Sequence, residues 1–267
     1  MKWYFQAPAR SVTRAFSIPE RPLNTEEVAR LASSFVCLWF AANWSVNAAL
    51  GYTSVSSTTI LSSMSGFFTL GCGVMFGVEK FSLGRLIAVG ASVIGVVLVS
   101  KSDHEMANAH GTSHSGQAVL GDALALSSAA LYALYVLLMK VKVKDESRVD
   151  MQLFFGFVGV ICLLGFWPMG FILHLAGIEP FVLPGSRKLW LSVAINAMIT
   201  FVSDYLYMLA MLKTSPLVVT LGLSLTLPVA VLGDLIKGLS LQLTALVGAA
   251  LVLSSFVLLS MVEEHDQ

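Results

Sequence analysis

The sequence predicts an all-α polytopic membrane protein that crosses the bilayer about eight times. Residues 31–78 form a run of 48 positions without Asp, Glu, Lys, Arg or His, although roughly 20 apolar residues are enough to cross a ~30 Å hydrocarbon core. The mean hydropathy is +0.80, and only 12% of the residues are charged, about half the fraction of a soluble domain. Because lipid cannot satisfy open strand edges, these segments are predicted to be helices.

The first two spans share the charge-free run, which turns once at residues 51–54. The other six are apolar stretches bounded by charged or turn-forming residues. The expected spans, in chain order, are Val28–Leu50, Val55–Gly77, Leu86–Ser100, Leu120–Met139, Met151–His174, Leu189–Met211, Leu217–Ile236 and Leu241–Val262.

Polar segments divide the spans into two units of three and five helices. The expected organisation is an irregular N-terminal segment 1–27, a first unit 28–100, a loop 101–118, a second unit 119–262 and a tail 263–267. The loop carries His104, His110 and His114, whose spacing makes a poor metal cage, so a solvated linker is expected and no metal site is predicted.

The distribution of basic residues predicts the orientation. Of the 16 Lys and Arg residues, 12 fall in segments on the same side as the N-terminus and 4 on the other. Basic residues gather on the cytosolic side of short loops, so both termini are expected in the cytosol.

Composition also excludes several functions. The formal net charge is zero, so no nucleic-acid partner is expected. The three cysteines lie in apolar runs without metal-ligand spacing. No HExxH motif, pair of buried carboxylates or His/Asp cluster occurs within the spans, so we expect neither an enzyme nor a cofactor.

An internal repeat relates the two units. Residues 40–54, FAANWSVNAALGYTS, match residues 201–215, FVSDYLYMLAMLKTS, at a constant offset of 161, which aligns Asn43 with Asp204. Equivalent spans are five helices apart, and an odd number implies that the two copies lie oppositely in the membrane. Inverted repeats are typical of secondary transporters, which bind substrate near the midplane.

Polar side chains at helical spacing form stripes along several spans. They predict a cavity with donors, acceptors and aromatic rings but few charges, suited to a neutral or weakly charged solute that is hydroxylated or ring-bearing. For each hydroxyl alone, a bond to its own helix is the competing interpretation. The candidate substrate-binding residues are Asn43, Trp44, Asn47, Ser62, Tyr132, Tyr135, Thr200, Asp204, Tyr207 and Ser224.

Asp204 is the strongest single candidate. A carboxylate near the bilayer centre costs about 2.5–3.5 kcal/mol on insertion scales, so it is expected to face a cavity or the protein interior. Two interpretations stay open: a substrate or proton site, or a structural hydrogen-bond partner.

Two positions are candidate hinges, and several glycines are candidate contact points. Pro228 interrupts the seventh span and frees a carbonyl near Ser224, and Gly66 stands at the matched place in the second span. The pairs Gly73/Gly77 and Ala91/Gly95 have GxxxG-like spacing, which predicts close helix–helix approach.

The run ALGYTSVSSTTILSSMSGFFTL followed by GVEKFSLGRLIAVGASVIGVVLVS resembles the fourth and fifth helices of the EamA unit of the drug/metabolite transporter superfamily. The segments GDALALSSAALYALYVLLMKVKV and VSDYLYMLAMLKTSPLVVTLGLSLTLPVAVLGDLI are similar to the F branch of solute carrier family 35, in its F5-like group with fungal vacuolar and thiamine-repressible proteins. The resemblance covers about residues 28–262.

The resemblance implies ten helices in two inverted five-helix bundles, so two helices are expected to precede Val28 in a complete carrier. It implies alternating-access transport of a small polar solute by exchange or proton coupling, in a vacuolar membrane or, as the runner-up, the Golgi or ER. Whether the carrier forms a homodimer stays open. The alternative is a non-transporting membrane protein of the same fold.

Overall fold

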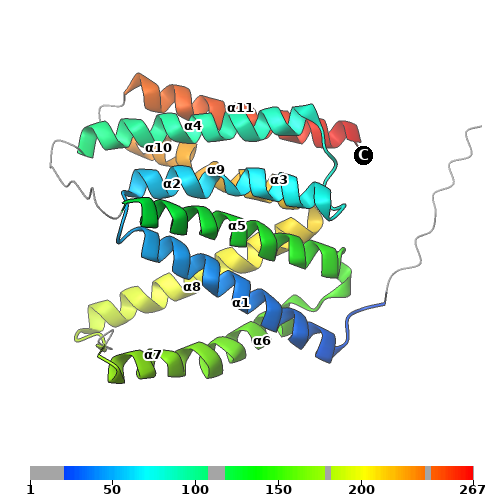
Figure 1. Cartoon of the computed structure of the whole chain (residues 1–267), viewed down its shortest axis with the longest axis vertical. Coiled ribbons are helices and arrows are strands. Elements are labelled where there is room, and N and C mark those ends of the chain that lie inside the picture. Colours follow the sequence, from blue (N-terminus) through cyan, green and yellow to red (C-terminus); the bar gives the residue numbers. More distant parts are fainter. Residues whose placement is uncertain (1–20, 108–117, 178–181, 238–241, 267) are drawn as a thin grey trace, which may run out of the picture.

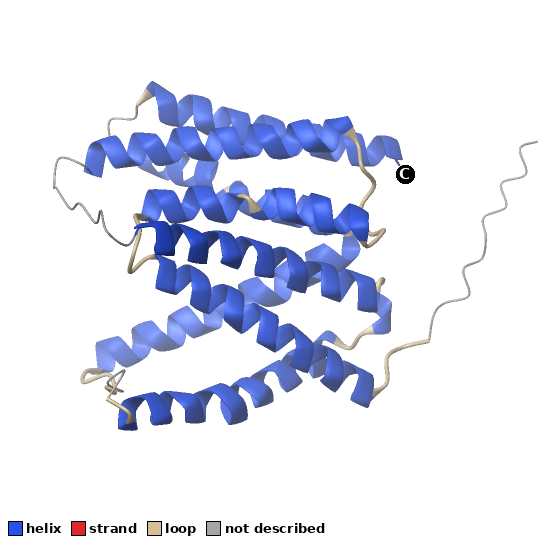
Figure 2. Cartoon of the chain, viewed as in Figure 1, coloured by secondary structure: helices blue, strands red, loops and turns tan. Residues whose placement is uncertain are grey.

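The computed structural model is built from helices that run roughly parallel to one another (Figure 1). It describes residues 21–107, 118–177, 182–237 and 242–266, and within them Figure 2 shows helices joined by loops, without strands. The histidine-bearing loop lies largely outside the described residues, as do residues 1–20 of the N-terminal segment.

The helices follow the predicted spans. Their bounds are α1 Thr25–Ala49, α2 Val55–Ser63, α3 Ser65–Met75, α4 Leu83–Ala107, α5 Ala118–Val143, α6 Met151–Ile161, α7 Trp167–Leu175, α8 Arg187–Lys213, α9 Pro216–Ser224, α10 Thr226–Ile236 and α11 Leu243–Asp266. A π-helical turn, Cys162–Phe166, joins α6 to α7. The third predicted span is longer than expected, because α4 continues through residue 107.

Seven stretches in the described part of the chain are long and apolar enough to cross a membrane: 55–75, 83–101, 118–143, 151–175, 187–213, 216–236 and 243–265. The prediction of an all-α polytopic membrane protein is therefore confirmed. The first predicted span, α1, has 25 residues but is not among the seven, and it is the helix that carries Asn43 and Asn47.

Local sequence signals set the helix ends. Asn24 and Glu27 form a capping box at the start of α1. Ser54 and Ser215, the serines of the repeated Thr-Ser pair, each accept a hydrogen bond from the backbone N–H three residues later, Ser57 and Val218 respectively. These serine side chains cap α2 and α9.

The second and seventh spans are both broken in the middle. The second pauses at Met64, between α2 and α3, and the seventh at Leu225, between α9 and α10. The four half-helices match in pairs at the repeat offset of 161 residues. The bounds of α2, 55–63, match those of α9, 216–224, and the bounds of α3, 65–75, match those of α10, 226–236. The proposed hinge residues Gly66 and Pro228 lie just beyond these breaks.

Two glycines bring α4 and α11 into backbone contact. A Cβ placed on Gly95 would lie 2.7 Å from the carbonyl oxygen of Gly248, and a Cβ on Gly248 would lie 2.7 Å from the carbonyl oxygen of Gly95. The pair runs side by side along one edge of the molecule (Figure 1). The expected close approach at Gly95 is confirmed.

The same expectation is wrong for Gly77. Gly77 has a φ of +68° and no atom within 4 Å of an added Cβ, so it forms a turn after α3 and not a helix contact. At Gly73, an added Cβ would lie 2.6 Å from Cγ of Glu79. Gly73 therefore makes room for a side chain that folds back from the following loop.

The two repeated Thr-Ser pairs sit at opposite ends of α5. Thr53 Oγ1 donates to Asp122 Oδ1 at 2.9 Å, near the start of α5. Lys140, near its end, donates to the carbonyl oxygen of Thr214 at 2.7 Å. Asp122 and Lys140 are 18 residues apart, about 27 Å along a helix. The segments that begin α2 and α9 are therefore on opposite sides of the bundle.

One edge of the molecule is open. α7 and the first half of α8 expose nearly all their side chains, while α1, α5, α6 and the second half of α8 enclose the largest apolar core. In Figure 1 this edge lies opposite the α4–α11 pair. Thr200 lies on the exposed part of α8.

Candidate functional site

The first cavity lies at the two helix breaks, and most of its lining residues carry a hydroxyl group. Its volume is about 240 Å³. No charged side chain is among its lining residues. We call it the hydroxyl cavity, and it is formed by Thr59, Ser62, Ser63, Ser65, Val96, Ala129, Tyr132, Thr220, Leu223, Ser224, Thr226 and Leu227.

Half of the eight hydroxyls around this cavity donate to nearby backbone carbonyls. Thr59 donates to the carbonyl oxygen of Val55 at 2.8 Å, and Thr220 donates to that of Pro216 at 2.7 Å. Ser62 differs, because its Oγ is buried without a hydrogen-bond partner in the described structure. A buried hydroxyl without a partner costs free energy, so Ser62 is available to a bound molecule.

The second cavity lies between α1, α5 and α8 and contains Asp204. Its volume is about 260 Å³. We call it the Asp204 cavity, and it is formed by Trp39, Ala42, Asn43, Tyr132, Tyr135, Ser203, Asp204, Tyr207 and Leu223. Asp204 is half-buried, and within the described part of the chain its carboxylate has no hydrogen bond or ion pair.

Tyr132 and Leu223 line both cavities, so the two cavities are adjacent. The Tyr132 hydroxyl meets the hydroxyl of Tyr207 in a hydrogen bond. The Tyr132 ring also packs edge-on against Tyr135, with ring centroids 5.1 Å apart. Two adjacent cavities with different chemistry therefore share one tyrosine.

Seven of the ten predicted binding residues line these cavities. Asn43, Tyr132, Tyr135, Asp204 and Tyr207 meet in the Asp204 cavity, and Ser62 and Ser224 in the hydroxyl cavity, which Tyr132 also lines. The other three lie outside both cavities and are exposed: Trp44, Asn47 and Thr200. Their role as binding residues stays a prediction that this arrangement does not favour.

The asparagine side chains are held by their own helix. Asn43 donates its amide to the carbonyl oxygen of Trp39, and Asn47 donates to that of Asn43, each at 2.8 Å. Asn43 lines the Asp204 cavity, and its amide nitrogen is occupied by the bond to Trp39.

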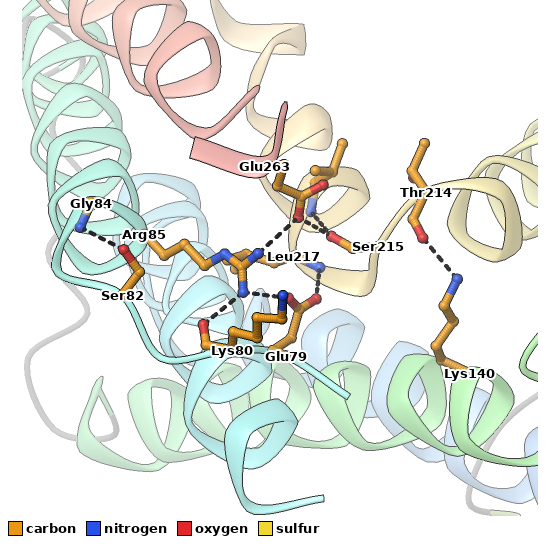
Figure 3. A network of polar contacts seen from close by, with 11 residues as sticks. Glu79, Lys80, Ser82, Gly84, Arg85, Lys140, Thr214, Ser215, Leu217 and Glu263 are labelled. Atoms are coloured by element: carbon orange, nitrogen blue, oxygen red, sulfur yellow. Dashed lines mark hydrogen bonds and ion pairs between the residues drawn. The ribbon is translucent and has the colours of Figure 1, made fainter. Parts of the chain in front are cut away.

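An ionic network that the sequence did not predict lies at one end of the bundle (Figure 3). Arg85 lies 3.5 Å from a carboxylate oxygen of Glu79 and 4.0 Å from one of Glu263. The side chains of Glu79 and Arg85 are only 2% and 6% exposed, so this pair is buried. Glu263 also accepts a hydrogen bond from Ser215 Oγ at 2.6 Å.

Glu79 connects the network to the start of α9. Its Oε1 accepts a hydrogen bond from the backbone N–H of Leu217 at 3.1 Å. Burial raises the pKa of Glu79 above its ordinary value, and the charge of Glu263 adds to this, while the Leu217 N–H and Arg85 oppose it. Burial is the largest of these causes, so the pKa of Glu79 is raised.

Lys140 closes the neighbouring helix end. Its Nζ donates to the carbonyl oxygens of Met211, Leu212 and Thr214 at 3.3, 2.8 and 2.7 Å. A lysine at this position satisfies the carbonyls left open at the end of α8. Figure 3 shows Lys140 pointing from α5 toward Thr214.

The sequence held one signal for this network. Glu79 follows directly on a long charge-free run, only four residues after α3 ends. Nothing in the sequence indicates that Arg85 and Glu263 meet, because they lie 178 residues apart and come together through the packing of α4 on α11.

A bundle of apolar helices with two broken spans and polar cavities at the breaks is the construction of a polytopic membrane transporter. The comparisons with known proteins agree. The family model for solute carrier family 35 (SLC35F) matches residues 34–166. An uncharacterized transporter of Schizosaccharomyces pombe is 46% identical over 91% of this chain and 71% of its own length.

Two further relatives support the same family. An uncharacterized vacuolar membrane protein of Saccharomyces cerevisiae is 43% identical over 92% of this chain and 65% of its own length. Solute carrier family 35 member F5 of Bos taurus is 39% identical over 80% of this chain and 40% of its own length. The chain belongs to the F branch of solute carrier family 35.

The chain matches only part of each of these relatives. It covers 71% of the first, just under two thirds of the second and two fifths of the bovine protein. The relatives named here are therefore longer than the segment that they share with this chain.

Proposed function

We propose that the chain is a secondary-active transporter that moves a small polar organic solute across a membrane by alternating access. The observation that carries this proposal is the pair of cavities beside the broken second and seventh spans. Broken helices expose backbone groups and polar side chains inside a membrane protein, where transporters of this construction bind their solutes. The bound solute would contact Ser62, Ser224 and the lining of the Asp204 cavity.

The proposal divides the chain into two inverted units, residues 28–100 and 119–262. It is supported by the helix bounds that recur at an offset of 161, and by the two Thr-Ser pairs at opposite ends of α5. In alternating access, such units rock against each other around a fixed site. Gly66 and Pro228, just past the breaks, are the proposed hinges.

The ionic network supports the idea of a closed end. Leu217, which is bonded to Glu79, is seven residues from Ser224, or about 10 Å along a helix. A buried apolar cluster made by Leu70, Ala88, Val89, Leu217, Leu221 and Leu259 occupies this interval. In the proposed cycle, this cluster and the ionic network separate the hydroxyl cavity from the aqueous space at that end.

Asp204 is the proposed coupling residue if transport is linked to protons, and solute exchange is the other coupling mode. Proton coupling would make uptake into vesicles depend on pH. The Asp204→Asn variant should then transport without pH dependence. An unchanged pH profile in this variant would remove the proton role of Asp204.

The proposed location is the vacuolar membrane, with both termini in the cytosol. It is supported by the Saccharomyces cerevisiae relative, which is named as a vacuolar membrane protein.

The test of the function is uptake by vesicles that contain the purified full chain. Vesicles are incubated with a metabolite extract, and their contents are compared with those of empty vesicles by untargeted mass spectrometry. A transported solute should accumulate, and Ser62→Val and Ser224→Val should each reduce its accumulation. Thr200→Val is the matched control, because Thr200 is exposed and outside both cavities, and it should transport normally.

The alternative is a non-transporting protein of the same fold. If vesicles that contain the folded protein accumulate no solute from any extract, the result would support this alternative and contradict the carrier proposal.

A further inference from the structure

We propose that the Asp204 cavity binds the cationic group of an organic solute, and that the hydroxyl cavity binds the uncharged polar part of the same molecule. This inference rests on the proposed carrier function and names its substrate class. Its basis is the difference in lining between the two adjacent cavities, because the carboxylate and most of the aromatic rings line one and most of the Ser and Thr hydroxyls line the other.

The first argument is charge. Asp204 is the only charged side chain among the nine residues of its cavity, and it has no partner within the described part of the chain. An ionised carboxylate in a membrane interior is costly until a cation or a proton neutralises it. The same charge repels phosphate, carboxylate and other anionic groups from this cavity.

The second argument is the aromatic lining. Four rings surround the space beside the carboxylate: Trp39, Tyr132, Tyr135 and Tyr207. The faces of these rings attract organic cations, and aromatic cages are the usual protein sites for quaternary ammonium groups. Tyr132 meets both Tyr135 and Tyr207 edge-on, at centroid distances of 5.1 and 6.0 Å, so the three tyrosines form one cluster in the cavity lining.

The third argument disfavours calcium and magnesium. Calcium and magnesium require about six oxygen ligands. The non-aromatic polar groups of this cavity are only Asn43, Ser203 and Asp204, and the amide nitrogen of Asn43 is already bonded to Trp39. An ammonium group needs one counter-charge and apolar or aromatic contacts, and this lining supplies both.

The hydroxyl cavity fits the remainder of such a solute. It has no charged side chain, and the unpartnered Ser62 Oγ can donate to or accept from a hydroxyl or amide. The cavities have volumes of about 240 and 260 Å³, each below the usual range of ligand sites, and they adjoin at Tyr132 and Leu223. A small molecule with a cationic head and a neutral polar tail matches this pair.

The test is ligand binding by the purified full chain in lipid nanodiscs at a fixed pH, followed by isothermal titration calorimetry. The probes are tetramethylammonium, choline and N-methylpyridinium, with 3,3-dimethylbutan-1-ol as the neutral isostere of choline. Choline should bind at least about tenfold more tightly than the neutral alcohol, a difference of ~1.4 kcal/mol. Asp204→Asn should remove that preference.

Asp234→Asn is the matched control, because Asp234 is also a half-buried carboxylate in a membrane span but lines neither cavity. It should keep the preference for choline. Tyr207→Phe should keep binding and Tyr207→Leu should weaken it, because only the second removes a ring. Circular dichroism and gel filtration check that each variant is folded.

Binding of no cation, equal binding of choline and the neutral alcohol, or unchanged binding by folded Asp204→Asn would overturn the inference. The binding test is independent of transport. If choline binds through Asp204 but vesicles take up no solute, the cation site stands and the carrier proposal fails. If vesicles accumulate only neutral or anionic solutes in a Ser62-dependent way, the carrier stands and the cation site fails.

Discussion

The carboxylate of Glu79 accepts a hydrogen bond from the backbone N–H of Leu217, which lies 138 residues further along the chain. Leu217 is the second residue of α9, so its N–H has no partner inside the helix. A negative charge at this end is also favoured by the helix dipole. One side chain from the segment after α3 therefore anchors a helix of the second unit.

Removal of the Arg85 charge should destabilise the protein. Arg85→Met leaves the buried carboxylate of Glu79 without its cationic partner, and loss of one partner of a buried pair costs about 3 kcal/mol. The free energy of unfolding, measured with denaturant in detergent, should fall by about this amount. Glu26→Gln is the control, because the Glu26–Arg30 pair is exposed, and it should change stability by less than about 1 kcal/mol.

Glu79 should also give the protein a recognisable dependence of stability on pH. Its pKa in the fold lies above the ordinary value of 4.5, so the folded state holds this proton more tightly than the unfolded state. The protonated form of Glu79 therefore stabilises the fold. This contribution is fully present below pH 4.5 and is lost as the pH rises through the pKa that Glu79 has in the folded protein. The unfolding free energy of the wild type, relative to Glu79→Gln, should therefore increase from pH 7 to 4.5. A constant difference across this interval would contradict the raised pKa.

Larger residues at the α4–α11 contact should separate the two helices. A Cβ at Gly95 would lie 2.7 Å from a backbone oxygen of Gly248, and the backbone cannot turn aside as a side chain can. Gly95→Ala should lower the thermal unfolding midpoint, with a loss of about 1–3 kcal/mol. Gly90→Ala on the same helix meets no atom within 4 Å and should be neutral or stabilising. Equal midpoints for the two variants would argue against the backbone contact.

Lys140 should contribute to the end of α8. Lys140→Met keeps a side chain of similar length but loses three bonds to backbone carbonyls, at a cost of about 1–3 kcal/mol. Hydrogen exchange should show faster opening of the last turn of α8 in this variant. Lys142→Met, two residues along α5, makes no such bond to α8 and should leave exchange at residues 208–213 unchanged.

The membrane spans could be predicted because each depends on composition along a single segment. Charge-free runs located the helices, and the Thr53-Ser54 and Thr214-Ser215 pairs indicated where α2 and α9 begin. The grouping of Asn43, Tyr132 and Asp204 was also accessible, because stripes at helical spacing mark the face that a helix turns inward.

The rest of the candidate site depends on how distant segments pack against each other. The spacing of residues along one helix does not reveal this packing. Thr200 lies four residues from Asp204 and shares its stripe, yet the first half of α8 is exposed, so Thr200 contributes to neither cavity. Trp44 follows Asn43 directly but is 58% exposed. The meeting of Glu79, Arg85 and Glu263 likewise requires three segments to converge.

The backbone contact between Gly95 and Gly248 has a mechanical consequence. Helices that touch through their main chains have no intervening side chains to change rotamer, so α4 and α11 have little freedom to slide at this contact. Each belongs to a different unit of the proposed carrier. If the units tilt against each other during a transport cycle, they would pivot at this contact. The largest displacement would then occur at the far edge of the molecule, where α6, α7 and the first half of α8 lie.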